Sequence, residues 1–306
     1  MYDCSQTLER RERPRRFGAA LLAGFLALSL TACLKVSAPA AAAPTGPLQQ
    51  APDGRRLQMT FEDEFDSFRP WRNGHGVWRT VFKDGRADDP ELRTLTSNHE
   101  LQLYVDPYMP IGVSGGEAAQ ALDPFVVKNG VLDIVARPTP RGLTRALGGF
   151  AYTSGLITTQ PSFSQTYGYF EMRARLPRGK GVWPAFWLLP ADLSWPPEID
   201  VMESIGDPAE VYTTAHSNVD KTPTTKTEIS SEGFHTFAVT WDRRNIVWYV
   251  DGREVKRQPT PSDMHKPMYM LANVAVGGDW PGAPDATTPF PARMSIDYIR
   301  AYRFAP

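Results

Sequence analysis

The segment Gly168-Tyr-Phe-Glu-Met-Arg-Ala-Arg-Leu176 alternates apolar and polar side chains along most of its length. Its apolar members stand at every second position: Phe170, Met172, Ala174 and Leu176. Successive side chains of a β-strand point to opposite faces. This period of two therefore predicts a strand with one buried side and one side that faces solvent.

Short runs of the same kind recur along the chain. Ile246-Val-Trp-Tyr-Val250, the pair Asp251-Gly252 and Arg253-Glu-Val255 together predict a hairpin with a tight turn. Further strand-like runs occupy residues 99–105, 131–137, 211–217, 235–241, 268–275 and 294–303. Because Pro and Gly clusters separate these runs and no long helical period competes, we predict an all-β fold, an antiparallel sandwich of two sheets.

The strand-like segment Glu198-Ile-Asp-Val-Met-Glu203 carries three carboxylates. Strand alternation points Glu198 and Asp200 to the same side, but it sends Glu203 to the opposite side. Glu203 rejoins the other two only if one extra residue is inserted as a β-bulge, because a bulge re-aims the side chains that follow it. We predict such a bulge around Val201-Met202.

Carboxylates held close together repel one another, and functional sites use this repulsion to push pKa values apart. Glycoside hydrolysis needs such a separation, because one carboxylate attacks while another protonates the leaving oxygen. Retaining glycosidases hold the two carboxyls about 5–5.5 Å apart. Four regular strand steps span roughly 13 Å. The strand must therefore curve, so that the side chains of Glu198 and Glu203 tip toward each other. The alternative interpretation is a half-exposed strand with a solvated acidic face.

Several motifs resemble glycoside hydrolase family 16 and follow its order from about residue 58 to residue 304. Besides the acidic segment, they are Gly168–Leu176, Gly181–Leu189, Asn98–Gln102, Phe234–Trp241, Val276–Gly282 and Ile296–Tyr302. The six-residue acidic motif is similar to that of the laminarinase-like branch. The resemblance implies a concanavalin A-like jelly roll with an open cleft on its concave sheet. An open cleft suits internal cleavage of a polymer.

The resemblance also implies a role for each acid. Glu198 matches the family's nucleophile, Glu203 its general acid/base, and Asp200 the helper carboxylate that hydrogen-bonds the nucleophile. These roles fit retaining hydrolysis, in which a covalent intermediate forms and the acid later acts as a base. His216 stands where related enzymes often have a His near the acid/base, although a single His is also commonly structural. The chemistry needs no cofactor.

Sugar rings have apolar faces and polar edges, so a sugar cleft is expected to combine aromatic platforms with hydrogen-bonding groups. The expected platforms are tryptophans next to Pro and near family motifs: Trp183, Trp195 and Trp280. Asn98 and Glu100 resemble positions on the cleft rim that touch substrate. Tryptophans that alternate with apolar residues in strand-like runs are expected in the core: Trp187, Trp241 and Trp248.

Three functions are compatible with these motifs. The first is a retaining endo-glycosidase that hydrolyses internal β-1,3 or mixed β-1,3/1,4 linkages in a β-glucan or a bacterial exopolysaccharide. The second is a carbohydrate-binding protein on the same fold, which has no need for three positioned acids. The third is a transglycosylase. For the first function, Trp195-Pro-Pro-Glu198 departs from the laminarinase pattern and resembles bacterial enzymes that depolymerise succinoglycan-type exopolysaccharide.

Many relatives hold a structural calcium ion on the convex face, and the resemblance implies two ligands for such an ion here. Asp297 matches the position in the last strand, and Glu62 is the candidate near the start of the domain. Carboxylate oxygens suit calcium, but both acids are equally compatible with ordinary surface positions. The ion would stabilise the fold and take no part in catalysis.

Residues 1–33 predict an export signal of the bacterial lipoprotein type. A basic stretch from Arg10 to Arg16 precedes an apolar stretch, Phe17 to Leu30, that is short for a membrane span. Leu30-Thr-Ala-Cys33 resembles a lipoprotein cleavage site, so Cys33 would carry lipid and anchor the protein to an envelope membrane. The alternative is an ordinary secretory signal cut near residues 40–43, which would release the protein.

Residues 34–55 are rich in Ala and Pro and predict a flexible tether, and residues 56–306 predict one large catalytic domain, expected as a monomer. Without residues 1–33, 28 basic residues stand against 31 acidic ones. This mild balance argues against nucleic acid as a partner and leaves polysaccharide as the expected one. Both cysteines, Cys4 and Cys33, precede the tether, so the domain has no disulfide and no thiol nucleophile.

Cys33→Ala should move the protein from the membrane fraction to the soluble fraction of a bacterial host, because lipidation modifies this thiol. Cell fractionation followed by immunoblotting measures the change. Cys4→Ala is the matched control and should stay with the membranes. Membrane association of the Cys33→Ala protein would instead indicate that the apolar stretch remains as an uncleaved anchor.

Overall fold

The computed structural model describes residues 46–83, 89, 92–109 and 122–306. All described residues belong to one compact unit, which lies within Ala41–Pro306. The predicted signal and lipidation site, including Cys33, therefore lie outside the described residues.

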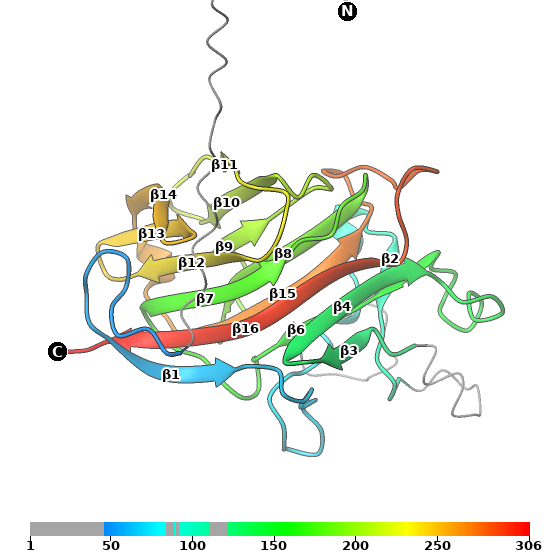
Figure 1. Ribbon diagram of the computed structural model, residues 1–306, viewed down its shortest axis with the longest axis horizontal. Helices are drawn as coiled ribbons and strands as arrows, with labels where there is room; N and C mark the ends of the chain where they lie inside the picture. The colour runs from blue at the N-terminus through cyan, green and yellow to red at the C-terminus, as the bar shows by residue number, and fades with distance from the viewer. Residues whose placement is uncertain (1–45, 84–88, 90–91, 110–121) are drawn as a thin grey trace, which may run out of the picture. The chain divides into compact units, whose positions relative to one another are not determined.

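Ten strands form one sheet with the order β14-β13-β12-β7-β16-β4-β5-β2, to which β1 is added beside β16 and β3 beside β4 (Figure 1). All its pairs are antiparallel except β2 with β5. The strands are β1 (Leu57–Asp63), β2 (Gln102–Tyr104), β3 (Phe125–Lys128), β4 (Val131–Pro138), β5 (Tyr152–Ser154), β7 (Gly168–Arg175), β12 (His235–Trp241), β13 (Asn245–Val250), β14 (Arg253–Pro259) and β16 (Ala292–Phe304).

Six strands form the second sheet, which is antiparallel and has the order β11-β10-β9-β8-β15-β6. They are β6 (Leu156–Thr158), β8 (Val182–Pro190), β9 (Glu198–Glu203), β10 (Glu210–His216), β11 (Thr225–Glu228) and β15 (Met268–Val276). The described helices are two short 3₁₀ turns, η2 (Thr96–Asn98) and η3 (Ser262–Met264). No helix in the described part of the chain is both long and apolar enough to cross a membrane.

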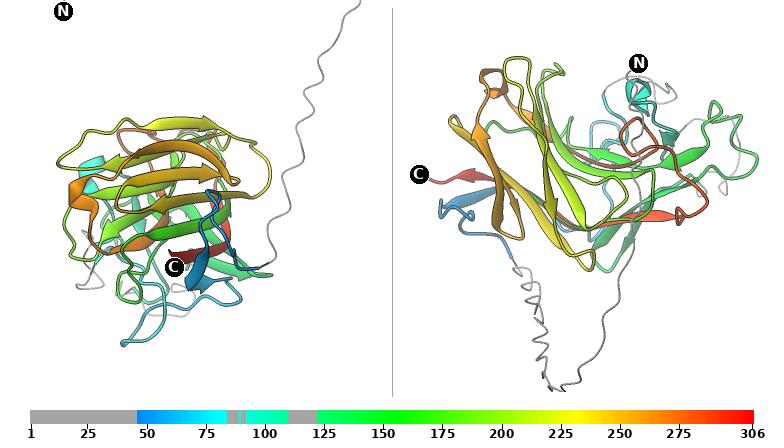
Figure 2. Two further views of the ribbon diagram at one scale, coloured as in Figure 1. Left: turned by 90° about the vertical axis from the view of Figure 1, so that its left-hand side faces the viewer. Right: turned by 90° about the horizontal axis from the view of Figure 1, so that it is seen from above.

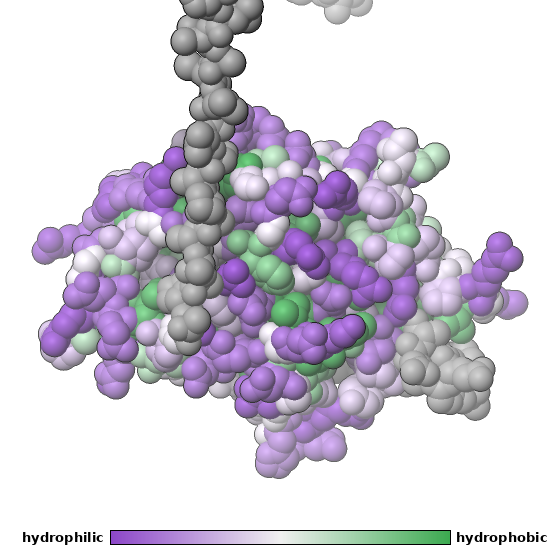
Figure 3. All heavy atoms as spheres, viewed as in Figure 1, coloured by the Kyte–Doolittle hydropathy of each residue, from purple (hydrophilic) through white to green (hydrophobic). Residues whose placement is uncertain are grey.

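The two sheets stack as curved layers with one hydrophobic core between them (Figure 2). Both sheets contribute to the same buried cluster, for example Phe170 and Met172 from β7 and Phe186 and Leu188 from β8. The predicted two-sheet sandwich is therefore confirmed. The face of the molecule seen in Figure 3 is mostly hydrophilic, with small apolar patches between the charged groups, as expected for a surface that meets solvent.

The predicted inward face of β7 is confirmed, since Phe170, Met172 and Ala174 are fully buried. Its outward face differs from the prediction, because Tyr169 and Glu171 are buried as well. A second apolar cluster covers this side of the sheet. Its buried members are Ala51, Leu57, Tyr169, Ala238, Val247, Tyr249 and Tyr302, and Leu48 packs against them.

This second cluster shows that the folded domain begins before residue 56. The backbone N–H of Leu48 donates to the hydroxyl of Tyr302, and the guanidinium of Arg300 donates to the carbonyl of Gly46. Ala51 is buried. The described part of the predicted tether, residues 46–55, is thus packed onto the sheet, because its apolar side chains cover the aromatic rings beneath.

The predicted hairpin and two of the predicted core tryptophans are confirmed. β13 pairs with β14 across Asp251 and Gly252, whose φ angles of 50° and 73° belong to a left-handed two-residue turn. Trp241 and Trp248 are fully buried between the sheets.

A chain that starts at residue 56 should be less stable than a chain that starts at residue 46. Removal of residues 46–55 exposes apolar surface on Leu57 and Tyr302 and removes the hydrogen bonds made by Leu48 and Gly46. We expect the free energy of unfolding to fall by roughly 1–3 kcal/mol. Urea unfolding followed by tryptophan fluorescence measures it. Equal midpoints for the two chains would contradict the packed role of residues 46–55.

Candidate active site

Strand β9 contains the predicted β-bulge, and its extra residue is Val201. On one side, Phe186 of β8 pairs with Met202 and the next residue, Trp187, pairs with Asp200, which leaves Val201 without a partner. On the other side, β10 shows the same shift between Tyr212 and Thr214. Val201 and Met202 consequently both point into the core.

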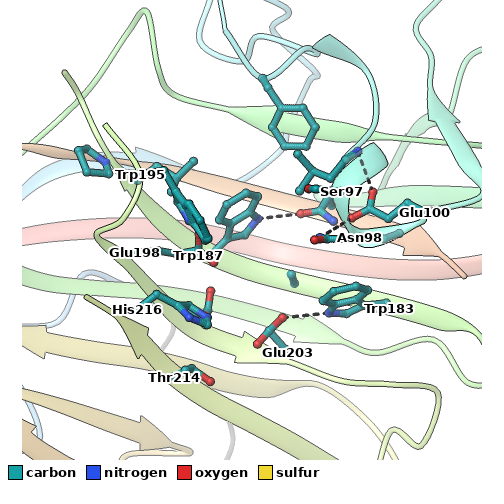
Figure 4. A pocket seen from close by; sticks show the side chains of 18 of the residues that line it. Ser97, Asn98, Glu100, Trp183, Trp187, Trp195, Glu198, Glu203, Thr214 and His216 are labelled. Atoms are coloured by element: carbon teal, nitrogen blue, oxygen red, sulfur yellow. Dashed lines mark hydrogen bonds and ion pairs between the residues drawn. The ribbon is translucent and has the colours of Figure 1, made fainter. Parts of the chain in front are cut away.

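The bulge brings the three acids of β9 to the same face of the six-stranded sheet. Glu198, Asp200 and Glu203 all line one cleft with a volume of about 600 Å³. The cleft floor comes from strands β8, β9, β10 and β15, and its walls come from residues 82–83, 95–100 and 193–195. Figure 4 shows Glu198 and Glu203 projecting from the sheet into this space.

Glu198, Asp200 and His216 form a compact group, with one potential ligand atom of each lying within 4.8 Å of the others. Nε2 of His216 lies 3.1 Å from Oδ2 of Asp200, and Nε1–H of Trp195 donates to Oε2 of Glu198 at 2.7 Å. His216 is also the cross-strand partner of Glu198. The sequence placed His216 near Glu203, but the structure places it beside Glu198 and Asp200, because Glu203 pairs with Tyr212 further along β10.

Burial is the largest cause that raises the pKa of each of the three acids. For Glu203 the pKa rises to about 8, with Glu198 adding to the increase and the hydrogen bond from Trp183 opposing it. Burial and the charge of Asp200 raise the pKa of Glu198, while burial and the charge of Glu203 raise that of Asp200. The carboxylates oppose one another's ionisation in one desolvated site, and Glu203, with a pKa of about 8, keeps its proton near neutral pH.

The predicted aromatic platforms all lie in the cleft: Trp183, Trp195 and Trp280. Trp195 is 67% exposed and Trp280 is 41% exposed, so their ring faces are available to a ligand. Trp183 donates through Nε1 to Oε1 of Glu203 at 3.0 Å. Trp280 packs edge-on against both Trp183 and Tyr212. Tyr212 of β10, which was not predicted, supports the ring of Trp280 next to the register shift of this strand.

Trp187 was predicted in the core, and this prediction is wrong in part. The side chain is largely buried but lines the cleft. Its Nε1 donates to Oδ1 of Asn273 at 2.7 Å, and Nδ2 of Asn273 donates to the hydroxyl of Tyr104 at 2.9 Å. Asn273 and Tyr104 also line the cleft and were not predicted. Strand periodicity does not show which face of a strand meets the core and which meets the cleft.

Asn98 and Glu100 lie at the cleft as predicted, but they differ in exposure. Glu100 is only 8% exposed, and it accepts hydrogen bonds from the backbone of Leu95 and the side chains of Asn98 and Gln102. His99, between them, adopts a left-handed conformation with φ of 55°. Glu100 therefore supports this loop from behind, and Asn98 is the member that reaches toward the cleft (Figure 4).

Neither candidate calcium ligand belongs to a group of three potential side-chain ligands among the described residues. The carboxylate of Asp297 is paired with Arg173 at 2.6 Å. Glu62 is exposed and stands opposite Arg300 in the register of β1 with β16. Among the described residues the group of three potential ligands is the one in the cleft, Glu198, Asp200 and His216. Calcium binding stays a prediction without a ligand set in the described part of the chain.

Comparisons with known proteins agree with this geometry. The sequence profile of the glycosyl hydrolases family 16 matches residues 91–300. Two curated relatives are the endo-1,3-1,4-beta-glycanases ExsH and EglC of Rhizobium meliloti (strain 1021), which are 46% and 44% identical over 252 and 253 residues. Each alignment covers 80% of this chain and 52% of the relative, so the chain spans about half the length of these proteins.

A solved structure of similar fold is the laminarinase catalytic domain from Thermotoga maritima MSB8. It is 33% identical in sequence and superposes with a TM-score of 0.65. The match covers 82% of this chain and 99% of that domain. The similarity therefore extends over both sheets and the cleft.

Trp183→Phe should raise the pKa of Glu203 above its value of about 8. The hydrogen bond from the indole N–H favours the charged carboxylate, so its loss favours the protonated form. The ¹³C shift of the Glu203 carboxyl, followed through a pH titration, measures the change. Trp187→Phe is the matched control, since its indole donates to Asn273, and a fall in the pKa of the Trp183→Phe protein would contradict the prediction.

Proposed function

The chain belongs to the glycosyl hydrolases family 16, and from this premise we propose that it is a retaining endo-glycosidase. It hydrolyses internal β-1,3 or mixed β-1,3/1,4 linkages in a β-glucan or a bacterial exopolysaccharide. The observation that carries the proposal is the convergence of three acids from one bulged strand in an open cleft, with Asp200 and Glu203 buried and Glu198 half-buried. A protein that only binds sugar has no need for this costly arrangement of charge.

Glu198 is the proposed nucleophile. Its Oε2 accepts a hydrogen bond from Trp195, and Asp200 hydrogen-bonds it from the same strand. The two hydrogen-bonded carboxyls share a proton, and this hydrogen bond raises the pKa of Glu198 and lowers that of Asp200, which favours the proton on Glu198 in the free site. The proton passes to Asp200 when Glu198 attacks the anomeric carbon as a carboxylate. As the glycosyl ester forms, the single negative charge of the pair leaves Glu198 and Asp200 keeps its proton, while His216, 3.1 Å from Oδ2 of Asp200, holds that carboxyl in place.

Glu203 is the proposed general acid/base. With a pKa of about 8 it is protonated near neutral pH and can donate its proton to the leaving oxygen. When Glu198 becomes an ester, the negative charge that helps raise the pKa of Glu203 is lost. The pKa of Glu203 then falls, which suits its second task of deprotonating the attacking water.

The shape of the cleft supports internal cleavage. Trp195 lies on the Glu198 side of the site and Trp183 on the Glu203 side (Figure 4). Trp280, which contacts Trp183, extends the second side. Aromatic platforms on both sides of the acids can bind sugar units before and after the scissile bond, as an endo-acting enzyme requires.

For the substrate, the names of the two relatives at 46% and 44% identity point to chains with both β-1,3 and β-1,4 linkages. The laminarinase similarity makes a β-1,3-glucan the second candidate. We further propose that the protein is exported and held at the cell envelope by lipid on Cys33, which places the enzyme where extracellular polysaccharide is found. Hydrolysis is proposed ahead of transglycosylation, which would use the same acids.

Glu198→Gln should lower turnover by at least about 10³-fold while binding of the polymer is retained, because the amide keeps the shape but cannot attack. Reducing-sugar release and product size measure turnover on laminarin, barley mixed-linkage glucan and succinoglycan. Rapid shortening of one polymer by the native protein would identify its substrate. Substantial residual hydrolysis by the variant would refute the nucleophile assignment.

Two variants act as controls for this experiment. Glu232→Gln makes the same change at an exposed carboxylate that lies near Arg178 outside the cleft, and it should leave activity unchanged. Glu203→Gln should lower kcat/KM for the polymer by about 10²–10⁴-fold. The fall in kcat/KM should be far smaller for an aryl glycoside, because the leaving group of that substrate needs no proton. Equal falls in kcat/KM on both substrates would contradict the role of Glu203 as the acid.

A further inference from the structure

Two side chains of the ten-stranded sheet reach across the core to the back of the bulge in β9. Trp248 of β13 and Lys256 of β14 are direct cross-strand partners. Trp248 is fully buried and Lys256 is 9% exposed. The ammonium of Lys256 lies 4.6 Å from the centre of the Trp248 ring, so the two side chains form one unit.

The hydrogen bonds of this unit go to the backbone around the bulge. Nε1–H of Trp248 donates to the carbonyl of Asp200 at 2.8 Å, immediately before the inserted Val201. Nζ of Lys256 donates to the carbonyl of Thr213 at 3.1 Å and to the carbonyl of Pro223 at 2.8 Å. Thr213 is the residue of β10 that stands opposite the bulge, between the partners of Asp200 and Glu203.

A bulge interrupts the ladder and leaves backbone groups near it without their regular partners. In a buried sheet such groups need other hydrogen bonds, since an unpaired carbonyl is costly. Trp248 and Lys256 supply donors on both sides of the irregularity, to β9 and to β10. The position of Asp200 and the aim of Glu203 are set by this part of the backbone.

A buried ammonium is an expensive way to satisfy two carbonyls, because burial opposes its charge and lowers the pKa of Lys256 to about 8. Asp200 of β9 is the charged group that acts on it. The other elements around Lys256 contribute carbonyls, from β10 and the segment before β11, and the ring of Trp248 from β13. A positive charge behind the sheet favours ionised acids in front of it.

We infer that Lys256 and Trp248 are positioning residues for the acids of the cleft: they fix the bulge in β9 from behind and set the charge balance of Asp200. This inference rests on the proposed hydrolytic function. Neither residue lines the cleft or touches substrate, so both act through the backbone of Asp200 and Thr213 and through the field of the ammonium.

Trp248→Phe in the full chain should lower kcat on the preferred glucan by about tenfold or more and leave KM within about twofold, because the acids shift while the sugar platforms stay. Trp241→Phe is the matched control. It is also a fully buried Trp of the ten-stranded sheet, and its Nε1 has no hydrogen-bond partner within the described structure. It should lose stability without the selective loss of kcat.

Lys256→Met keeps an unbranched apolar stem and removes the donors and the charge. Besides a similar fall in kcat, the acid limb of kcat/KM should move to higher pH. The acid limb reports ionisation of the Glu198–Asp200 pair, which must lose one of its two protons before Glu198 can attack. The ammonium lowers the pKa of Asp200, so its loss makes the pair harder to ionise and moves this limb to higher pH. All variants are compared well below their melting temperatures, with folding checked by near-UV circular dichroism.

The inference is overturned if Trp248→Phe and Trp241→Phe lose kcat equally, or if folded Lys256→Met keeps the native kcat and pH profile. A variant that fails to fold is replaced by Lys256→Gln, which keeps donors without the charge and should retain more kcat but show the same shift of the acid limb. Failure of the proposed function is distinguishable, because the native chain would then hydrolyse none of the glucans.

Discussion

The single residue inserted into β9 at Val201 is the constraint on which the site depends. In a regular strand Glu203 would point into the core with its carboxyl opposite to that of Glu198. The insertion instead turns Val201 and Met202 together into the core and returns Glu203 to the cleft. This shift of one residue thus decides whether Glu203 lies apart from Glu198 and Asp200 or joins them in the cleft.

The electrostatics of the cleft follow from the same arrangement. A buried acid with a raised pKa opposes folding as the pH increases. For Glu203, the folded state binds more protons than the unfolded state between the ordinary value of 4.5 and about 8, so its contribution to stability is lost across that interval. The hydrogen bonds from Trp183 and Trp195 to the two glutamates partly offset this cost.

Local periodicity was sufficient to predict the sandwich and the β13–β14 hairpin, because each depends on the spacing of neighbouring side chains. The bulge was predicted from the need for Glu203 to share a face with Glu198 and Asp200, since strand alternation alone sends it to the opposite face. The roles of the acids came from resemblance, and the structure adds their common cleft. Other features depend on the packing of segments that are distant in the sequence, and local periodicity could not predict them. The packing of Leu48 and Ala51 under the sheet, the cleft-facing edge of Trp187 and the position of His216 beside Asp200 are of this kind.

The most direct test of the account is the configuration of the first products. Proton NMR during early hydrolysis of mixed-linkage glucan would resolve the α and β anomers of the new reducing ends before they equilibrate. If Glu198 forms a glycosyl ester that Glu203 then helps to hydrolyse, the β anomer appears first. First formation of the α anomer would mean a single displacement by water and would contradict the assigned roles of both acids.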